Sequence, residues 1–242
     1  MTKRLGGDGI NTPTDRTLDE TITGIYWGYD NPVWIGVPIR FHLQVAHKVA
    51  LEHGTSESEN ARLFAVLALT LADASISSFK SKYENAFWRP IVAIRAGDND
   101  LNKVTKGDPT WTPLGSQRSN KGGIPFSPNF PAYSAGHAAL CGASMKTLAF
   151  VFGSSTSFSF VSDEYNGTTT NGDGSSRPYV KKHFDSFHAA AEECAFSRVY
   201  LGVHWDWDGD SGLFEGDKVA TYAQENLMLP LNDRNHHELD TG

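Results

Sequence analysis

Apolar residues recur every three or four positions along most of this chain, which is the spacing of helices that bury one face. Six segments show this pattern, and we expect a helix in each: 18–29, 38–52, 56–87, 136–152, 185–201 and 213–227. Ser56 and Glu59 are spaced as a capping box that opens the third segment, and Pro90 ends or kinks it at Arg89. The pattern therefore predicts an all-α fold.

The stretches between these helices are polar and rich in turn-forming residues. Residues 97–135 are rich in Gly, Pro, Asn, Asp and Ser, and they predict a long loop, a feature that is usually functional or disordered in a compact domain. Residues 153–178 are polar, with one short strand expected at 157–161. We expect one helical domain over 17–230, with tails at 1–16 and 231–242.

The fifth helix carries a charge in its apolar stripe. Arg198 continues the stripe, whose other members follow in steps of four and three: Phe187, Ala191, Cys194 and Leu201. A guanidinium cannot shed its charge, so a buried Arg198 needs an anionic partner. His204 follows six residues later, and in a continuous helix it would point about 120° away from Arg198. Gly202 is suited to end the helix between them, which lets both side chains converge. The alternative to a functional site is a purely structural arrangement, in which a buried Arg–Asp pair lies beside a core histidine.

Two more cations stand on the third helix. Lys82 and Arg89 are seven residues apart, so they lie on one helix face about 10 Å apart. Phe79, Phe87 and Trp88 surround them and partly exclude solvent. An exposed basic helix face is the alternative for this pair taken alone.

A loop that runs straight into a helix supplies a third group. Gly136 and His137 open the fourth helix, where free backbone amides and the helix dipole favour an oxyanion. Together, the three stretches offer three permanent positive charges, an amide and two imidazoles. This set fits a highly charged tetrahedral or trigonal-bipyramidal oxyanion such as phosphate or vanadate, whereas three nearby cations would repel zinc.

Composition narrows the classes of partner. The chain has 242 residues and a formal net charge of −7, which leaves no electrostatic footprint for nucleic acid or an anionic membrane. The longest apolar run, 63–76, is too short to span a bilayer and contains Asp73. The N-terminus has no apolar core of the kind found in signal peptides. The cellular compartment stays undetermined, because a secreted protein could be represented here without its signal peptide. Cys141 and Cys194 each lie on an apolar stripe, and we expect buried free thiols.

The three charged stretches resemble the signature of the vanadium-dependent haloperoxidases and of the type-2 phosphatidic acid phosphatases that share their fold. They read KYENAFWRP (82–90), SAGH (134–137) and SRVYLGVHWDWD (197–208). Further stretches favour the chloroperoxidase-like branch of the haloperoxidases: GIYWGYD (24–30), DPTWTPLG (108–115), FPAYSAGHA (130–138), DEYNG (163–167) and KHFDSF (182–187). The resemblance covers residues 24–206 and implies a helical bundle with long active-site loops.

The resemblance also implies a vanadate cofactor and a role for each matching residue. His204 would bind vanadium through a ring nitrogen, and His137 would be the acid–base group. The vanadate oxygens would be held by the following groups: Lys82, Arg89, Arg198 and the Gly136 amide. Asp30 would hold Arg198, Asp208 would orient the segment that carries His204, and Phe79 and Phe130 would line the halide side of the pocket.

Two departures from the family pattern stand out. Position 135, where the family serine donates a hydrogen bond to vanadate, is Ala135, so weaker vanadate binding is expected. Ser134 replaces the family proline. The full-length enzymes of the family also carry a further helical bundle before this region. We therefore expect the chain to be a shortened relative, a fragment, or a homo-oligomer that completes its core by self-association.

The resemblance implies oxidation of halide by hydrogen peroxide to hypohalous acid, which then halogenates small organic acceptors. Phe79 and Phe130 favour a chloride-capable pocket over one restricted to bromide. The alternatives are a phosphomonoesterase that forms a phosphohistidine at His204, and a non-catalytic oxyanion-binding domain.

Overall fold

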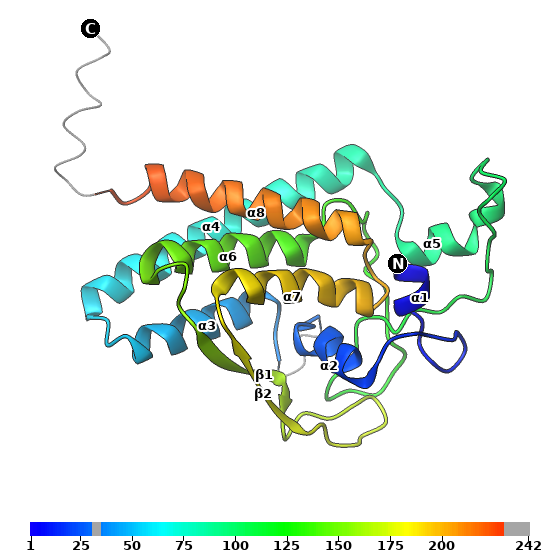
Figure 1. The fold of residues 1–242 in the computed structure, drawn as a ribbon, viewed down its shortest axis with the longest axis horizontal. Helices are drawn as coiled ribbons and strands as arrows, with labels where there is room; N and C mark the ends of the chain where they lie inside the picture. The colour runs from blue at the N-terminus through cyan, green and yellow to red at the C-terminus, as the bar shows by residue number, and fades with distance from the viewer. Residues whose placement is uncertain (31–34, 230–242) are drawn as a thin grey trace, which may run out of the picture.

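The computed structural model describes residues 1–30 and 35–229, and within them it is a helical bundle with one small hairpin (Figure 1). The helices are α1 (Thr2–Leu5), α2 (Leu18–Tyr26), α3 (Ile39–Glu52), α4 (Glu57–Asn85), α5 (Pro90–Arg95), the 3₁₀ turn η1 (Gly97–Asn99), α6 (Gly136–Phe152), α7 (Phe187–Tyr200) and α8 (Asp206–Asn226). Strands β1 (Phe158–Asn166) and β2 (Tyr179–Phe184) pair antiparallel. The predicted helical fold is confirmed.

Helix α6 is the centre of the bundle, packed against α4, α7 and α8 (Figure 1). Its contact with α8 is so close that a Cβ added at Gly216 would lie 2.1 Å from the Ala139 carbonyl oxygen. A Cβ at Gly212 would lie 2.5 Å from the Ala135 carbonyl oxygen. Glycine is therefore required at both positions because the two backbones touch there.

An aromatic cluster fills the space between α2, α3, α7 and the hairpin. Trp27 is fully buried and has ring contacts with Phe41, Phe160 and Phe184. The Tyr26 hydroxyl donates to the Phe160 carbonyl at 2.6 Å. These contacts tie α2 to the hairpin, and α2 leads directly into the segment that holds Asp30.

Most helix boundaries follow the sequence pattern, and the exceptions have physical reasons. The capping box at Ser56 is present, and α4 ends at Asn85 with Ala86 as its C-cap, whose φ of 47° is left-handed. Helix α8 begins at Asp206, seven residues before the predicted start, because its first turns bury small glycines, including Gly209, instead of large apolar side chains. The predicted strand extends to residue 166. Its partner β2 was not predicted because its burial does not follow residue polarity: Tyr179 is exposed and Lys182 is half-buried.

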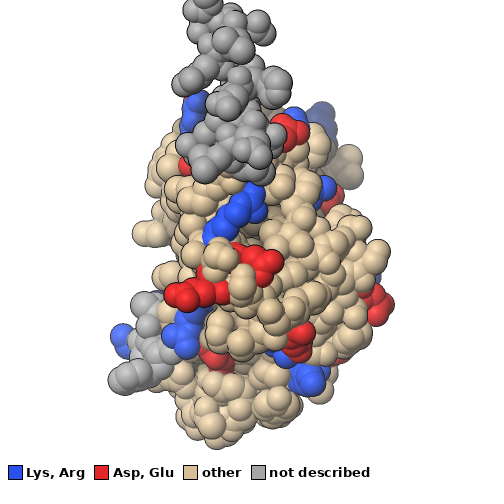
Figure 2. Space-filling view, turned by 90° about the vertical axis from the view of Figure 1, so that its left-hand side faces the viewer, with Lys and Arg blue, Asp and Glu red and all other residues tan. Residues whose placement is uncertain are grey.

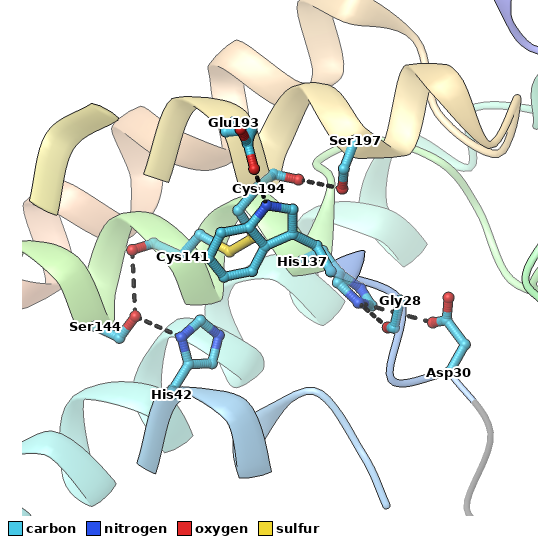
Figure 3. Close-up of a disulfide and its surroundings, with 10 residues drawn as sticks. Gly28, Asp30, His42, His137, Cys141, Ser144, Glu193, Cys194 and Ser197 are labelled. Carbon is cyan, nitrogen blue, oxygen red and sulfur yellow. Dashed lines mark hydrogen bonds and ion pairs between the residues drawn. A yellow bond between two sulfur atoms is a disulfide. The ribbon is translucent and has the colours of Figure 1, made fainter. Parts of the chain in front are cut away.

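The expectation of two free thiols is wrong. Cys141 on α6 and Cys194 on α7 form a disulfide, with their Cα atoms 6.5 Å apart (Figure 3). Each cysteine lies on the buried stripe of its own helix, as the pattern predicted, and the packing of α6 on α7 brings the two stripes together. That pairing depends on how the helices dock, which the spacing within one helix does not show.

The first sixteen residues, expected as a tail, pack against the bundle. Thr2 is buried, and its hydroxyl donates to the His204 carbonyl at 3.1 Å. Arg16 donates to the Tyr200 carbonyl at 3.1 Å. The N-terminal segment therefore supports the end of α7 and the turn that follows it.

One stretch, Glu57–Arg95, is long and apolar enough to cross a membrane by length and composition, with a mean hydropathy of 1.5 in its most apolar window. Leu63, Leu67 and Leu71 from this stretch lie in the bundle core, so α4 is a core helix. On the face in Figure 2, acidic and basic side chains lie close to one another between larger uncharged areas.

Candidate functional site

A cavity of about 350 Å³ lies between the start of α3, the second half of α4, the start of α6 and the end of α7. Nine of the eleven predicted site residues line it: Asp30, Phe79, Lys82, Arg89, Phe130, Gly136, His137, Arg198 and His204. Asp208 and Ala135 are adjacent to lining residues but do not line the cavity themselves. Segments separated by more than 170 residues in the sequence thus meet at one place.

Arg198 has the anionic partner that its burial requires. Its Nη2 donates to Asp30 Oδ2 at 2.8 Å, and Arg198 is 1% exposed. The Ser116 hydroxyl donates to the same oxygen at 2.7 Å. Burial alone would raise the pKa of Asp30, but Arg198, His137 and Ser116 hold it below its ordinary value. Asp30 is therefore an ionised carboxylate that fixes the guanidinium at the wall of the cavity.

His204 is held from both sides. Its Nδ1 lies 3.0 and 3.1 Å from the two carboxyl oxygens of Asp208, which is fully buried at the start of α8. Arg89 Nη1 donates to His204 Nε2 at 2.8 Å. Burial, and then Arg89 and Lys82, lower the pKa of His204 well below its ordinary value. The ring is therefore neutral, with its proton on Nδ1 and a lone pair on Nε2.

Lys82 is fully buried and turned toward a loop. Its ammonium donates to the carbonyls of Ala132 at 2.8 Å and Pro131 at 3.2 Å, and also to the Ser134 carbonyl. Burial and the nearby Arg89 lower the pKa of Lys82 to about 7. Lys82 thus anchors the loop before α6, and binding an anion would require it to release one of these carbonyls.

His137 is a second neutral imidazole, set in the first turn of α6. Its Nε2 donates to the Gly28 carbonyl at 2.8 Å and lies 3.8 Å from Asp30 Oδ1 (Figure 3). Burial, and then Arg198, lower the pKa of His137 to about 4. The proton therefore sits on Nε2, which leaves Nδ1 as the atom that can accept a proton.

The first turn of α6 supplies amides rather than a capping side chain. Ala135 is the N-cap and provides no side-chain cap, and its own N–H donates to the Asp208 carbonyl at 3.1 Å. The Ala135 side chain packs with Ala138 and Ala195 in a small apolar cluster. The Gly136 amide follows at the cavity wall, in the turn whose N–H groups have no intrahelical acceptor.

Unpaired donors show what kind of ligand the cavity fits. Arg89 Nη2 and Arg198 Nε and Nη1 are buried, and none has a hydrogen-bond partner among the described residues. A buried guanidinium N–H without an acceptor costs free energy. An anion with several oxygens would supply acceptors for these atoms. Over residues 1–30 and 35–229, no cluster of three His, Cys, Asp or Glu side chains is placed to hold a bare metal ion. Vanadate or phosphate fits this donor set.

One wall of the cavity is apolar and aromatic. Phe79 and Phe130 lie with their ring centres 5.2 Å apart, and Phe79 remains 42% exposed. The Arg89 guanidinium and the Lys82 ammonium lie 4.9 and 5.4 Å from the centre of the Phe130 ring. Phe130 therefore separates the cationic end of the cavity from its open, apolar side.

Residues 62–233 match the family model described as the VCPO second helical-bundle domain. The chain belongs to this family. It is 33% identical over 238 residues to the vanadium chloroperoxidase of Curvularia inaequalis, an alignment that covers 84% of this chain and 38% of that enzyme. The chain therefore spans well under half of the curated relative that it matches, and the family resemblance seen in the sequence is confirmed.

Solved structures agree with this assignment. The fold is similar to that of a bacterial vanadium-dependent iodoperoxidase, with 25% identity and a TM-score of 0.67 over 88% of this chain and 44% of that one. It also matches a holo-type bacterial vanadium-dependent chloroperoxidase with 18% identity and a TM-score of 0.59, over 86% and 46% of the two chains. The second similarity concerns the fold alone.

Three contacts around the cavity were not found from the sequence. Ser116 binds Asp30, Thr2 binds the His204 carbonyl, and the Gly28 carbonyl binds His137. The sequence gives no local signal for these contacts, because each of them joins residues more than 80 positions apart.

Proposed function

We propose that this chain carries the oxyanion centre of a vanadate-dependent haloperoxidase, which oxidises halide with hydrogen peroxide to hypohalous acid. The observation that carries the proposal is the set of unpaired donors on Arg89 and Arg198, which face one cavity together with the acceptor nitrogen of His204. Membership in the family supports the choice of vanadate over phosphate.

The imidazole of His204 is the protein ligand in this proposal. Asp208 holds the Nδ1 proton, so Nε2 presents its lone pair to the metal once Arg89 turns its Nη1 toward an anion oxygen. The cations Lys82, Arg89 and Arg198 neutralise the oxyanion. The Gly136 amide adds a neutral donor at the helix N-terminus.

Bound vanadate supplies Lewis-acid chemistry that activates hydrogen peroxide for oxygen transfer to halide without a change of metal oxidation state. His137 accepts a proton from hydrogen peroxide at Nδ1, because its Nε2 proton is held by the Gly28 carbonyl. Lys82 would hold positive charge at the bound oxyanion after releasing one of its loop carbonyls. Phe79 and Phe130 give the halide side an apolar, aromatic lining, which favours a chloride-capable pocket with small organic molecules as final acceptors.

The test is peroxide-dependent halide oxidation by the purified chain, with and without added vanadate. The wild-type chain should be active only with vanadate, and His204→Ala should be inactive with an unchanged circular dichroism spectrum. Equal halide oxidation by His204→Ala at saturating vanadate would contradict the assignment. Turnover of phosphate esters that vanadate inhibits would instead indicate a phosphatase, and an inactive chain that still binds vanadate would indicate a binding domain.

A further inference from the structure

The oxyanion site lacks the hydroxyl that the family places at position 135, so another donor is expected near the same place. Three serines lie close to the cavity or to the loop that precedes α6: Ser75, Ser78 and Ser134. Their present hydrogen bonds show which hydroxyl is free to serve a bound anion.

Ser134 is committed elsewhere. Its hydroxyl donates to the Glu215 carboxylate on α8, which also accepts from the Ser77 hydroxyl. Ser134 is buried and does not line the cavity. A hydroxyl that donates to a carboxylate is held strongly, so Ser134 supports the loop rather than the ligand.

Ser75 lines the cavity, but its proton is used within its own helix. Its hydroxyl donates to the Leu71 carbonyl at 2.8 Å, a normal length for such a bond. A serine inside a helix commonly donates in this way to the backbone carbonyl four positions earlier. Ser75 therefore offers no proton to a ligand.

Ser78 differs from both. It lines the cavity, is fully buried, and stands one helical turn before Lys82 on α4. Its hydroxyl donates to the Ser134 carbonyl at 3.3 Å and accepts from the Ser134 hydroxyl at 3.5 Å. The bond that Ser78 donates is long for a bond between oxygens, so its proton is weakly held.

The position of Ser78 relative to Gly136 completes the argument. A Cβ added at Gly136 would lie 3.6 Å from Ser78 Oγ and 3.8 Å from Lys82 Cε. The hydroxyl is therefore beside the residue whose amide opens α6, at the polar end of the cavity. An oxyanion within reach of the Gly136 amide and of Lys82 is also within reach of Ser78.

We propose that Ser78 donates a hydrogen bond to the bound oxyanion and takes the place of the hydroxyl missing at Ala135. The inference depends on the proposed function only for the kind of ligand, which is a tetrahedral oxyanion. It predicts that the substitution at position 135 does not leave the anion one donor short, because the donor comes from α4 instead of the loop.

The experiment is calorimetric titration of orthovanadate into the wild-type chain, Ser78→Ala and Ser75→Ala at one pH. Loss of a hydrogen bond to a charged group corresponds to roughly a 10- to 100-fold weaker affinity. Ser78→Ala should show a loss in this range, while Ser75→Ala, which removes a hydroxyl from the same helix and cavity, should bind as the wild type does. Thermal melts of the ligand-free variants show whether either change alters the fold.

The outcomes separate this inference from the proposed function. Equal affinity of Ser78→Ala and the wild type overturns the inference, as does an equal loss in both variants. A wild-type chain that binds vanadate but oxidises no halide overturns the proposed enzyme, and the Ser78 inference is then decided by the affinity ratio alone. Absence of vanadate binding by the wild-type chain overturns both.

Discussion

Lys82 is the cation of the site whose charge depends most on pH. Burial and the neighbouring Arg89 and Arg198 lower its pKa to about 7, against the opposing effect of the Asp208 and Glu215 carboxylates. Below pH 7 the ammonium is charged and attracts an oxyanion, and above pH 7 the ligand-free site loses this charge. In the unfolded chain a lysine keeps its proton up to about pH 10.4, so the stability contributed by Lys82 rises with pH between these two values.

At the scale of single residues, we predict that the contribution of Lys82 to vanadate affinity depends on pH. The ratio of the dissociation constants of Lys82→Met and the wild type should be large at pH 6 and should shrink as the pH rises above 7. Comparing the two proteins at each pH removes the titration of vanadate itself. Lys80→Met, which removes an exposed lysine from the same helix, should match the wild type throughout. A ratio that stays constant from pH 5 to pH 9 would show that Lys82 does not titrate in this range.

At the scale of the elements, the contact of α6 with α8 places two groups of the site. Helix α6 carries His137 in its first turn, and α8 carries Asp208, which holds His204. The two helices meet at Gly216, where an added Cβ would lie 2.1 Å from a carbonyl oxygen of α6. At Gly209, on the same helix, the nearest atom would be 3.7 Å away, an ordinary contact.

We predict opposite effects for the same substitution at these two glycines. Gly216→Ala should lower the free energy of unfolding by about 3 kcal/mol or more, because the helices must move apart. Gly209→Ala should leave stability unchanged or raise it by up to about 1 kcal/mol, since alanine favours the helix. Urea denaturation of both variants measures the difference. A Gly216→Ala variant as stable as Gly209→Ala would mean that the helices are not in backbone contact there.

At the scale of the whole molecule, the N-terminal segment packs on the turn that carries His204. Thr2 donates to the His204 carbonyl, and Gly6 is packed so closely on Gly202 that a Cβ on Gly6 would lie 2.5 Å from the Gly202 Cα. Gly202 itself has a φ of 70°, which favours glycine. The turn between α7 and α8 is therefore held by residues about 200 positions earlier.

Removal of residues 1–8 should accordingly lower the melting temperature and weaken vanadate binding, because the turn that carries His204 loses its support. Differential scanning calorimetry and vanadate titration measure the two effects. Ile10→Ser serves as the control, since Ile10 is 90% exposed and its change should affect neither. A truncated chain with unchanged melting temperature and affinity would show that the segment is not needed to hold His204.

Local rules determined much of this protein from its sequence. Helix periodicity and capping depend on residues within about four positions of each other, so the main helices and the burial of Arg198 in its stripe could be predicted. The demand of that guanidinium for an anionic partner followed from its permanent charge alone. The permanent charges and the family motifs then indicated an oxyanion site before any contact was known. The expectation that Lys82 and Arg89 share one helix face was wrong, because α4 ends at Asn85 and Arg89 is the extended residue that precedes α5.

Tertiary structure decided everything that depends on how distant segments dock. The disulfide, the early start of α8, and the pairing of β2 with β1 depend on contacts between elements, which no local period shows. The same holds within the site, where the weakly held hydroxyl of Ser78 could be told from those of Ser75 and Ser134 only by their partners. A sequence shows which groups can donate or accept, and the packing of the bundle determines which of them are already satisfied and which are left for a ligand.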